Sequence, residues 1–283
     1  RKLEFLLGDA LAGGADTLVT VGGVQTNHGR LTAAAAAKAG LACTLVLDGA
    51  RPEKLSGNLL LDCLLGASLV YTDGRSTSAV IEETLAALQA AGRAPYFIPE
   101  GGSNAVGSAG YLAMVPELLA QADSLPVPPA RLVCTMGSLG TFAGLWLGAR
   151  AFGAPFSVTG VAVNPTTGYT REKAAALVNE MSAAYGLDIA AAPEDMDIIY
   201  ADAAHDYAGP GYNVPDAKTR GAVELLARTE GIFLDPCYTA KSFRGFCDIA
   251  RELDGGAIFV HTGGTPALWT QEHLDAFAAD YWN

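Results

Sequence analysis

The sequence of 283 residues is poor in positive charge. Its 18 lysines and arginines stand against 30 aspartates and glutamates, which gives a formal net charge of −12. No basic stripe is present that would neutralise the phosphates of a nucleic acid. The sequence also lacks an apolar run of about 18 residues, the length from which a membrane-spanning helix is predicted. We therefore expect neither a nucleic-acid nor a membrane partner.

Cysteine and histidine are also scarce. The five cysteines lie singly, without a Cys-x-x-Cys pair (Cys43, Cys63, Cys134, Cys237 and Cys247). The four histidines show no metal-ligand spacing. We expect free thiols in a reducing, cytoplasmic compartment and no metal site.

Strand and helix signals, by contrast, are abundant and alternate along the chain. Strands that alternate with helices are typical of mostly parallel sheets with right-handed crossovers. The predicted strands cover residues 17–21, 43–47, 68–71, 96–98, 131–135, 157–163, 197–200, 232–234 and 257–260. The predicted helices cover residues 1–11, 28–39, 58–65, 77–91, 107–121, 142–152, 171–185, 217–230 and 241–253.

A proline-rich segment, residues 122–129, divides this pattern. Three of its last four residues are prolines, which stop a helix and stiffen a connection. We predict two open, mostly parallel α/β domains, a smaller one over residues 6–122 and a larger one over residues 123–283. The cleft between two such domains is the expected ligand site.

The first predicted strand, residues 17–21, is followed by Gly22 and Gly23 and then by the polar residues Gln25, Thr26, Asn27 and His28 before an alanine-rich helix. In open α/β sheets, ligands bind outside the carboxyl ends of the strands. Thr26 or Asn27 can cap the helix, whose N-terminus attracts an anion. The segment therefore predicts part of a ligand site, and a capped turn without a ligand is the alternative.

A second strand-to-helix turn, residues 137–141, is suited to bind a phosphate. Backbone N–H groups, a hydroxyl and the helix dipole can bind one there. The turn has neither the Lys-Ser/Thr pair of a Walker A loop nor the Gly-x-Gly-x-x-Gly fingerprint. We interpret it as a cup for a single phosphate without a metal, and a turn needed only for packing is the alternative. Its residues are Gly137, Ser138, Leu139, Gly140 and Thr141.

Three further loops complete the set. Loops 209–212 and 235–239 each place a tyrosine, and loop 261–264 follows the last predicted strand with a hydroxyl and two glycines. Tyrosine can stack on a ring or transfer a proton, although a lone loop tyrosine also serves packing. One phosphate cup with several hydroxyls fits pyridoxal 5′-phosphate better than a nucleotide. Asp235 is predicted as a turn residue, and the sequence offers no role for Glu100.

These motifs, in this order, resemble the D-cysteine desulfhydrase / 1-aminocyclopropane-1-carboxylate deaminase family of the tryptophan-synthase-β-like (type II) pyridoxal-phosphate fold. The resemblance covers essentially the whole chain. It runs through residues 1–5, 25–28, 101–104, 137–141, 235–239 and 261–264. It implies pyridoxal 5′-phosphate in the cleft between the two domains, with the larger domain binding it. It also implies a small amino-acid substrate and a homodimer.

The family pattern at the front is Gly-Asn-Lys-x-Arg-Lys-Leu-Glu, and its first lysine forms the Schiff base with the cofactor. Aligned here, that lysine lies two residues before Arg1. Lys2 matches the second lysine, which in the family lies near the cofactor phosphate. We therefore expect further residues ahead of Arg1, including the first strands of the larger domain.

The resemblance also implies roles for the strand-end residues. It places Asn27 at the cofactor phenolate oxygen or the substrate carboxylate, with Thr26 and His28 beside it on the substrate. The phosphate cup is the segment 137–141. The resemblance implies that Thr26, Tyr212 and Tyr238 act in catalysis. Both tyrosines are also expected to bind the substrate, and Tyr238 is expected to contact the cofactor. Thr262, with Gly263, is expected to face the pyridine nitrogen.

Two positions separate the subfamilies. Thr239 stands where the deaminases have Glu, and His28 stands where they have Gln. A carboxylate there keeps the pyridine nitrogen protonated, which helps to open a cyclopropane that has no Cα hydrogen. A neutral Thr239 hydroxyl suffices when Cα–H is acidic and a β-substituent can leave. The expected reaction is therefore β-elimination from D-cysteine to pyruvate, sulfide and ammonia. L-cysteate sulfo-lyase, 1-aminocyclopropane-1-carboxylate deaminase, amino-acid racemase and a non-catalytic binding protein are the alternatives.

Overall fold

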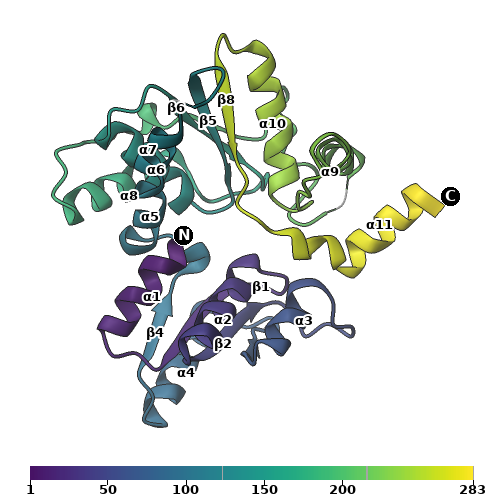
Figure 1. The fold of residues 1–283 in the computed structure, drawn as a ribbon. Coiled ribbons are helices and arrows are strands. Elements are labelled where there is room, and N and C mark those ends of the chain that lie inside the picture. The colour runs from purple at the N-terminus through teal and green to yellow at the C-terminus, as the bar shows by residue number, and fades with distance from the viewer. Residues whose placement is uncertain (123, 215, 283) are drawn as a thin grey trace.

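The computed structural model describes residues 1–122, 124–214 and 216–282, whose strands form two four-stranded sheets (Figure 1). The first sheet has the order β3-β2-β1-β4, and the second has the order β7-β6-β5-β8. All pairs are parallel, which confirms the predicted two-sheet α/β architecture. The strands are β1 (Thr17–Gly23), β2 (Ala42–Asp48), β3 (Ser68–Tyr71), β4 (Pro95–Ile98), β5 (Pro129–Met136), β6 (Ser157–Ala162), β7 (Ile198–Ile199) and β8 (Gly256–Val260).

The helices follow the predicted alternation closely. They are α1 (Lys2–Ala12), α2 (Asn27–Ala39), α3 (Gly57–Leu64), α4 (Thr77–Ala90), α5 (Ala105–Leu112), α6 (Met114–Ala122), α7 (Gly140–Ala151), α8 (Arg171–Ala184), α9 (Ala217–Glu230), α10 (Thr239–Glu252) and α11 (Gln271–Trp282). Short 3₁₀ helices are η1 (Glu100–Gly102), η2 (Pro193–Asp195) and η3 (Thr265–Trp269). The last helix, α11, had no counterpart in the prediction.

Two predicted elements were wrong. The single helix over 107–121 is two helices, α5 and α6, that meet at Ala113. Pro116 lacks the N–H that would continue the helical ladder to Leu112, so the break falls one turn before it. Residues 232–234 form no strand in the described structure. Ile232 and Phe233 are 45% and 56% exposed, which shows that this apolar run does not enter the sheet.

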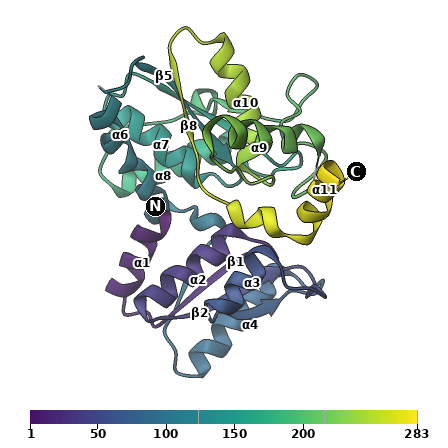
Figure 2. The same cartoon turned by 45° about the vertical axis from the view of Figure 1, so that its right-hand side comes forward.

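The central strands of each sheet are buried on both faces. In β1 and β2, consecutive residues such as Leu18, Val19 and Val46 are fully buried, as expected for a parallel sheet covered by helices. In the second half, α7 is buried along most of its length and lies at the centre of the larger core. Figure 1 shows α5 to α8 on one side of this second sheet and α9 and α10 on the other, and the turned view in Figure 2 agrees.

The packing also bears on the domain boundary. Helices α5 and α6 lie before residue 123, yet they pack against α7 of the second sheet, and Val115 belongs to its core. The division into residues 6–122 and 123–283 stays a prediction. Asp123, Pro215 and Asn283 lie outside the described residues. No helix in the described parts of the chain is long and apolar enough to cross a membrane.

Candidate active site

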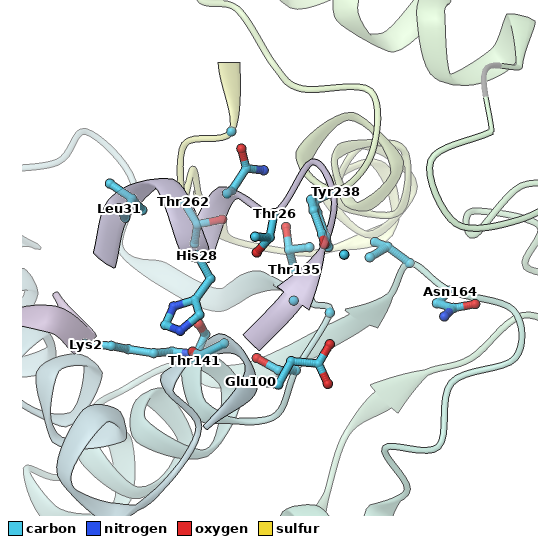
Figure 3. Close-up of a pocket in the computed structure, with 18 of the residues that line it drawn as sticks. Lys2, Thr26, His28, Leu31, Glu100, Thr135, Thr141, Asn164, Tyr238 and Thr262 are labelled. Carbon is cyan, nitrogen blue, oxygen red and sulfur yellow. The ribbon is translucent and has the colours of Figure 1, made fainter. Parts of the chain in front are cut away.

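A cavity of about 630 Å³ lies between the two halves of the protein, where the carboxyl ends of β1, β5 and β8 face one another. This volume is within the usual range for small-molecule and cofactor sites. Most of the predicted site residues line it, as Figure 3 shows in part: Lys2, Thr26, Asn27, His28, Gly137, Ser138, Thr141, Tyr212, Tyr238, Thr262 and Gly263. Three predicted site residues do not line the cavity in the described structure: Leu139, Gly140 and Thr239.

The predicted phosphate cup lies at the N-terminus of α7. The Ser138 hydroxyl accepts a hydrogen bond from Ser103 at 2.8 Å, and Ser103 accepts one from the Gly140 N–H at 3.1 Å. The hydroxyl proton of Ser138 therefore remains free to donate into the cavity. Leu139 is buried in the core behind the cup, and Gly140 starts the helix. A helix N-terminus with free hydroxyl donors favours an anion.

Lys2 supplies the positive charge of this end of the cavity. Its Nζ donates to the Gly101 carbonyl at 2.8 Å and to the Ser103 hydroxyl at 3.2 Å. Burial lowers the pKa of Lys2 to about 8, and no described carboxylate forms an ion pair with it. A bound anion would compensate that buried charge. A Cβ at Gly140 would lie 2.8 Å from the Ser103 and Ser108 hydroxyls and 3.0 Å from this Nζ, so glycine leaves room for all three groups.

The α2 N-terminus holds the predicted substrate-binding side chains. Thr26 is the N-cap, and its hydroxyl accepts from the Gly29 N–H at 3.2 Å. The Thr20 hydroxyl donates to the Ile98 carbonyl at 2.8 Å, so it accepts from Nε2 of His28, also at 2.8 Å. His28 therefore carries its proton on Nε2. Burial, together with the charge of Lys2, lowers the pKa of His28 to about 3, so this side chain is neutral.

The two predicted tyrosines meet at another part of the cavity. Tyr212 and Tyr238 share a hydrogen bond between their hydroxyls, and their rings pack edge to face with centroids 5.7 Å apart. Burial raises the pKa of both hydroxyls, so both are protonated. One hydroxyl donates to the other, and both tyrosines line the cavity. A Cβ at Gly137 would lie 2.9 Å from the Tyr238 ring, so glycine lets the ring approach β5.

Thr239 has a different environment from the one expected. Its hydroxyl donates to the Asp235 carboxylate at 2.6 Å and accepts from the Asp235 N–H at 2.8 Å. The same carboxylate accepts from the backbone N–H groups of Cys237, Tyr238 and Thr239. Asp235 thus forms the turn before α10, as predicted, and fixes the backbone of Tyr238. It also lines the cavity, which sequence reasoning missed because a turn role seemed sufficient.

Glu100 is a second lining residue without a predicted role. Its carboxylate accepts from the Tyr169 hydroxyl at 2.8 Å. Glu100 begins η1 after the first sheet, whereas Tyr169 lies between β6 and α8 of the second, so the bond joins the two halves beside the cavity. Thr135 and Asn164 also line the cavity (Figure 3) and carried no motif in the sequence.

The chain is similar to several known proteins. The family model described as pyridoxal-phosphate dependent enzyme matches residues 1–263. A Klebsiella pneumoniae protein named D-cysteine desulfhydrase is 40% identical over 279 residues, 95% of this chain and 82% of its own. A Pyrococcus abyssi protein, provisionally named 1-aminocyclopropane-1-carboxylate deaminase, is 38% identical over 274 residues, 95% of this chain and 80% of its own. The crystal structure of an ACC deaminase homologue is 34% identical with a TM-score of 0.86, covering 98% of this chain and 82% of that one.

Proposed function

The chain belongs to the pyridoxal-phosphate dependent enzyme family, as its motifs predicted, and from this premise we propose that it is a lyase that eliminates sulfide from D-cysteine. One water molecule is consumed, and the products are pyruvate, sulfide and ammonia. The observation that carries the proposal is Lys2, a half-buried lysine with no ion-pair partner among the described residues, beside the N-terminus of α7. That arrangement fits the phosphate of pyridoxal 5′-phosphate, the cofactor of this family.

The remaining lining residues suit the other parts of the cofactor. Ser138 and Thr141 would hold the phosphate with Lys2, and Thr262 would face the pyridine nitrogen. Asn27 would meet the phenolate oxygen or the substrate carboxylate. When bound, the cofactor supplies an electron sink that makes the Cα proton of an amino acid acidic. The lysine that removes this proton is expected two residues before Arg1, and it stays a prediction.

The chain's own residues then bind the substrate and hold a proton. The Thr26 hydroxyl and the N-terminus of α2 would bind the substrate carboxylate. His28 assists as a neutral hydrogen-bonding group, because its lowered pKa excludes a charged imidazolium at neutral pH. Tyr212 and Tyr238 remain protonated, so the pair can donate to the departing sulfur. Thr26, Tyr212 and Tyr238 are therefore the proposed catalytic residues.

Deamination of 1-aminocyclopropane-1-carboxylate is the second candidate, because relatives with that name share this fold. The Thr239 position argues for elimination instead. Its hydroxyl is engaged with Asp235, and it offers no carboxylate where the deaminases have Glu. We further propose a cytoplasmic homodimer, supported by the family resemblance and by the five free cysteines.

A substrate panel tests the proposal. The full-length protein, loaded with pyridoxal 5′-phosphate, is offered D-cysteine, L-cysteine, L-cysteate and 1-aminocyclopropane-1-carboxylate in parallel. We expect sulfide and pyruvate from D-cysteine. Sulfite from L-cysteate would assign a sulfo-lyase, and α-ketobutyrate would assign a deaminase. Interconversion of the cysteine enantiomers without pyruvate would indicate a racemase.

A further inference from the structure

Asn58, in the first turn of α3, is completely buried and is not among the described residues that line the cavity. Its side chain nevertheless reaches the cavity-lining segment through Asn27. The Asn58 Nδ2 donates to the Gln25 carbonyl at 2.9 Å and to Oδ1 of Asn27 at 2.7 Å. Its Oδ1 accepts from Nε of Arg30 at 3.2 Å. All the hydrogen-bonding groups of this amide are therefore directed at named partners.

The chemistry of these partners fixes the orientation of the amide. An arginine Nε–H can only donate, so the Asn58 atom that faces Arg30 must be the oxygen. A backbone carbonyl can only accept, so the atom that faces the Gln25 carbonyl must be the nitrogen. That nitrogen then faces Asn27, whose contacting atom must be an acceptor. Asn27 therefore keeps its oxygen on Asn58 and has its own NH₂ group left over.

We propose that Asn58 is a positioning residue that holds the Asn27 amide with its NH₂ group turned toward the ligand. Asn27 then acts as a donor to an anionic oxygen, either the cofactor phenolate or the substrate carboxylate. This inference rests on the proposed function only in naming those two oxygens. Without Asn58, the Asn27 amide can flip by about 180° and turn its oxygen toward the ligand. That oxygen would repel either the phenolate or the carboxylate.

The neighbouring groups favour a fixed orientation. Backbone N–H of Asn58 also donates to Oε1 of Gln25 at 2.9 Å, so α3 and the segment before α2 are joined by bonds in both directions. The Gln25 Nε2 donates to the Ser56 carbonyl at 3.1 Å. This network lies between two elements that are far apart in sequence. A substitution at Asn58 should therefore change the orientation of Asn27 and leave the phosphate-binding end of the cavity unchanged.

The test uses the full-length protein loaded with pyridoxal 5′-phosphate and the variant Asn58→Asp. The new carboxylate still accepts from Arg30, but its second oxygen faces the Gln25 carbonyl and Asn27 and no longer donates. Asn27 is expected to turn its NH₂ group away from the ligand. Asn179→Asp on α8 is the matched control, because Asn179 makes one donated and one accepted bond with Ala191 on the protein surface. Asn58→Ala decides the question if Asn58→Asp does not fold.

Two measurements show whether Asn27 donates to the cofactor phenolate or to the substrate carboxylate. If Asn27 donates to the phenolate, the pH titration of the bound cofactor's absorbance shifts upward by about one pH unit or more without any substrate. If it donates to the substrate carboxylate, the spectrum is unchanged and KM for D-cysteine rises about 10- to 100-fold with a smaller effect on kcat. Either result supports the proposal when Asn179→Asp shows neither change.

An Asn58→Asp protein with the wild-type spectrum and wild-type KM would overturn the proposal. So would equal changes in the Asn179→Asp control. The absorbance titration tests Asn58 whether or not the proposed reaction is correct. If the wild-type protein bound the cofactor but eliminated sulfide from neither enantiomer of cysteine, the proposed function would fail, and the absorbance titration would still test Asn58.

Discussion

Asp62, one turn after Asn58 on α3, provides a stability prediction with a defined sign. The residue is fully buried, and neither of its carboxylate oxygens has a hydrogen-bond partner among the described residues. Burial raises the pKa of Asp62 to about 7, and the nearby charge of Arg30 offsets only part of that effect. The folded protein therefore holds this proton more tightly than the unfolded chain does, where the pKa is 3.8. Stability from Asp62 is greatest below pH 3.8 and is lost as the pH rises toward 7.

The variant Asp62→Asn removes this titration while keeping the shape of the side chain. Between pH 5 and pH 8, the wild-type protein should lose roughly 3 kcal/mol of unfolding free energy relative to the variant, from about 1.4 kcal/mol per pKa unit. Urea unfolding at the two pH values measures the difference, with Asp188→Asn, a change at an exposed position, as the control. A constant gap between variant and wild type at both pH values would refute this reasoning, as would a variant that is less stable only at pH 8.

Four further predictions concern the cavity. Lys2→Met should weaken binding of pyridoxal 5′-phosphate about 10-fold or more, since a charge-assisted contact is lost; titration by fluorescence measures it. In the wild type, whose Lys2 has a pKa of about 8, affinity for inorganic phosphate should fall as the pH rises above 8. Unchanged affinity in either experiment would place the phosphate elsewhere. Tyr238→Phe should lower kcat for D-cysteine about 100-fold with the cofactor retained, because the Tyr238 hydroxyl and its proton are lost and the hydrogen bond that positions Tyr212 is broken. An unchanged kcat in steady-state kinetics would contradict this prediction. Gly140→Ala should reduce cofactor affinity, since the new Cβ would lie 2.8 Å from the Ser103 hydroxyl; equilibrium dialysis would contradict this if the affinity were unchanged.

The fold followed from patterns that are local. The runs that became β1 and β5 are apolar and β-branched, and the glycines and polar groups after them mark where each strand ends. Local patterns failed where a single residue or the tertiary environment decided the outcome. Pro116 interrupts a helix whose apolar spacing continues through it, and residues 232–234 are apolar enough for a strand but have no neighbouring strand to pair with in the described structure.

The site was predictable in its parts but not in their connections. Motifs at strand ends identified Thr26, Ser138 and Thr262 as cavity-lining residues, because the carboxyl ends of parallel strands meet in one cleft. The contacts that orient these residues are made by side chains with no motif. Asn58 is 31 positions from Asn27, and no spacing rule relates the two. The engagement of Thr239 by Asp235 likewise depends on the turn geometry before α10.

The most direct test of the central claim is the stoichiometry of products from D-cysteine. The full-length protein, loaded with pyridoxal 5′-phosphate, is incubated with D-cysteine, and pyruvate, sulfide and ammonia are measured together over time. The account predicts equal amounts of all three, at a rate well above that with L-cysteine. Bound cofactor with no sulfide release from D-cysteine would contradict it, and so would sulfide released without an equal amount of pyruvate.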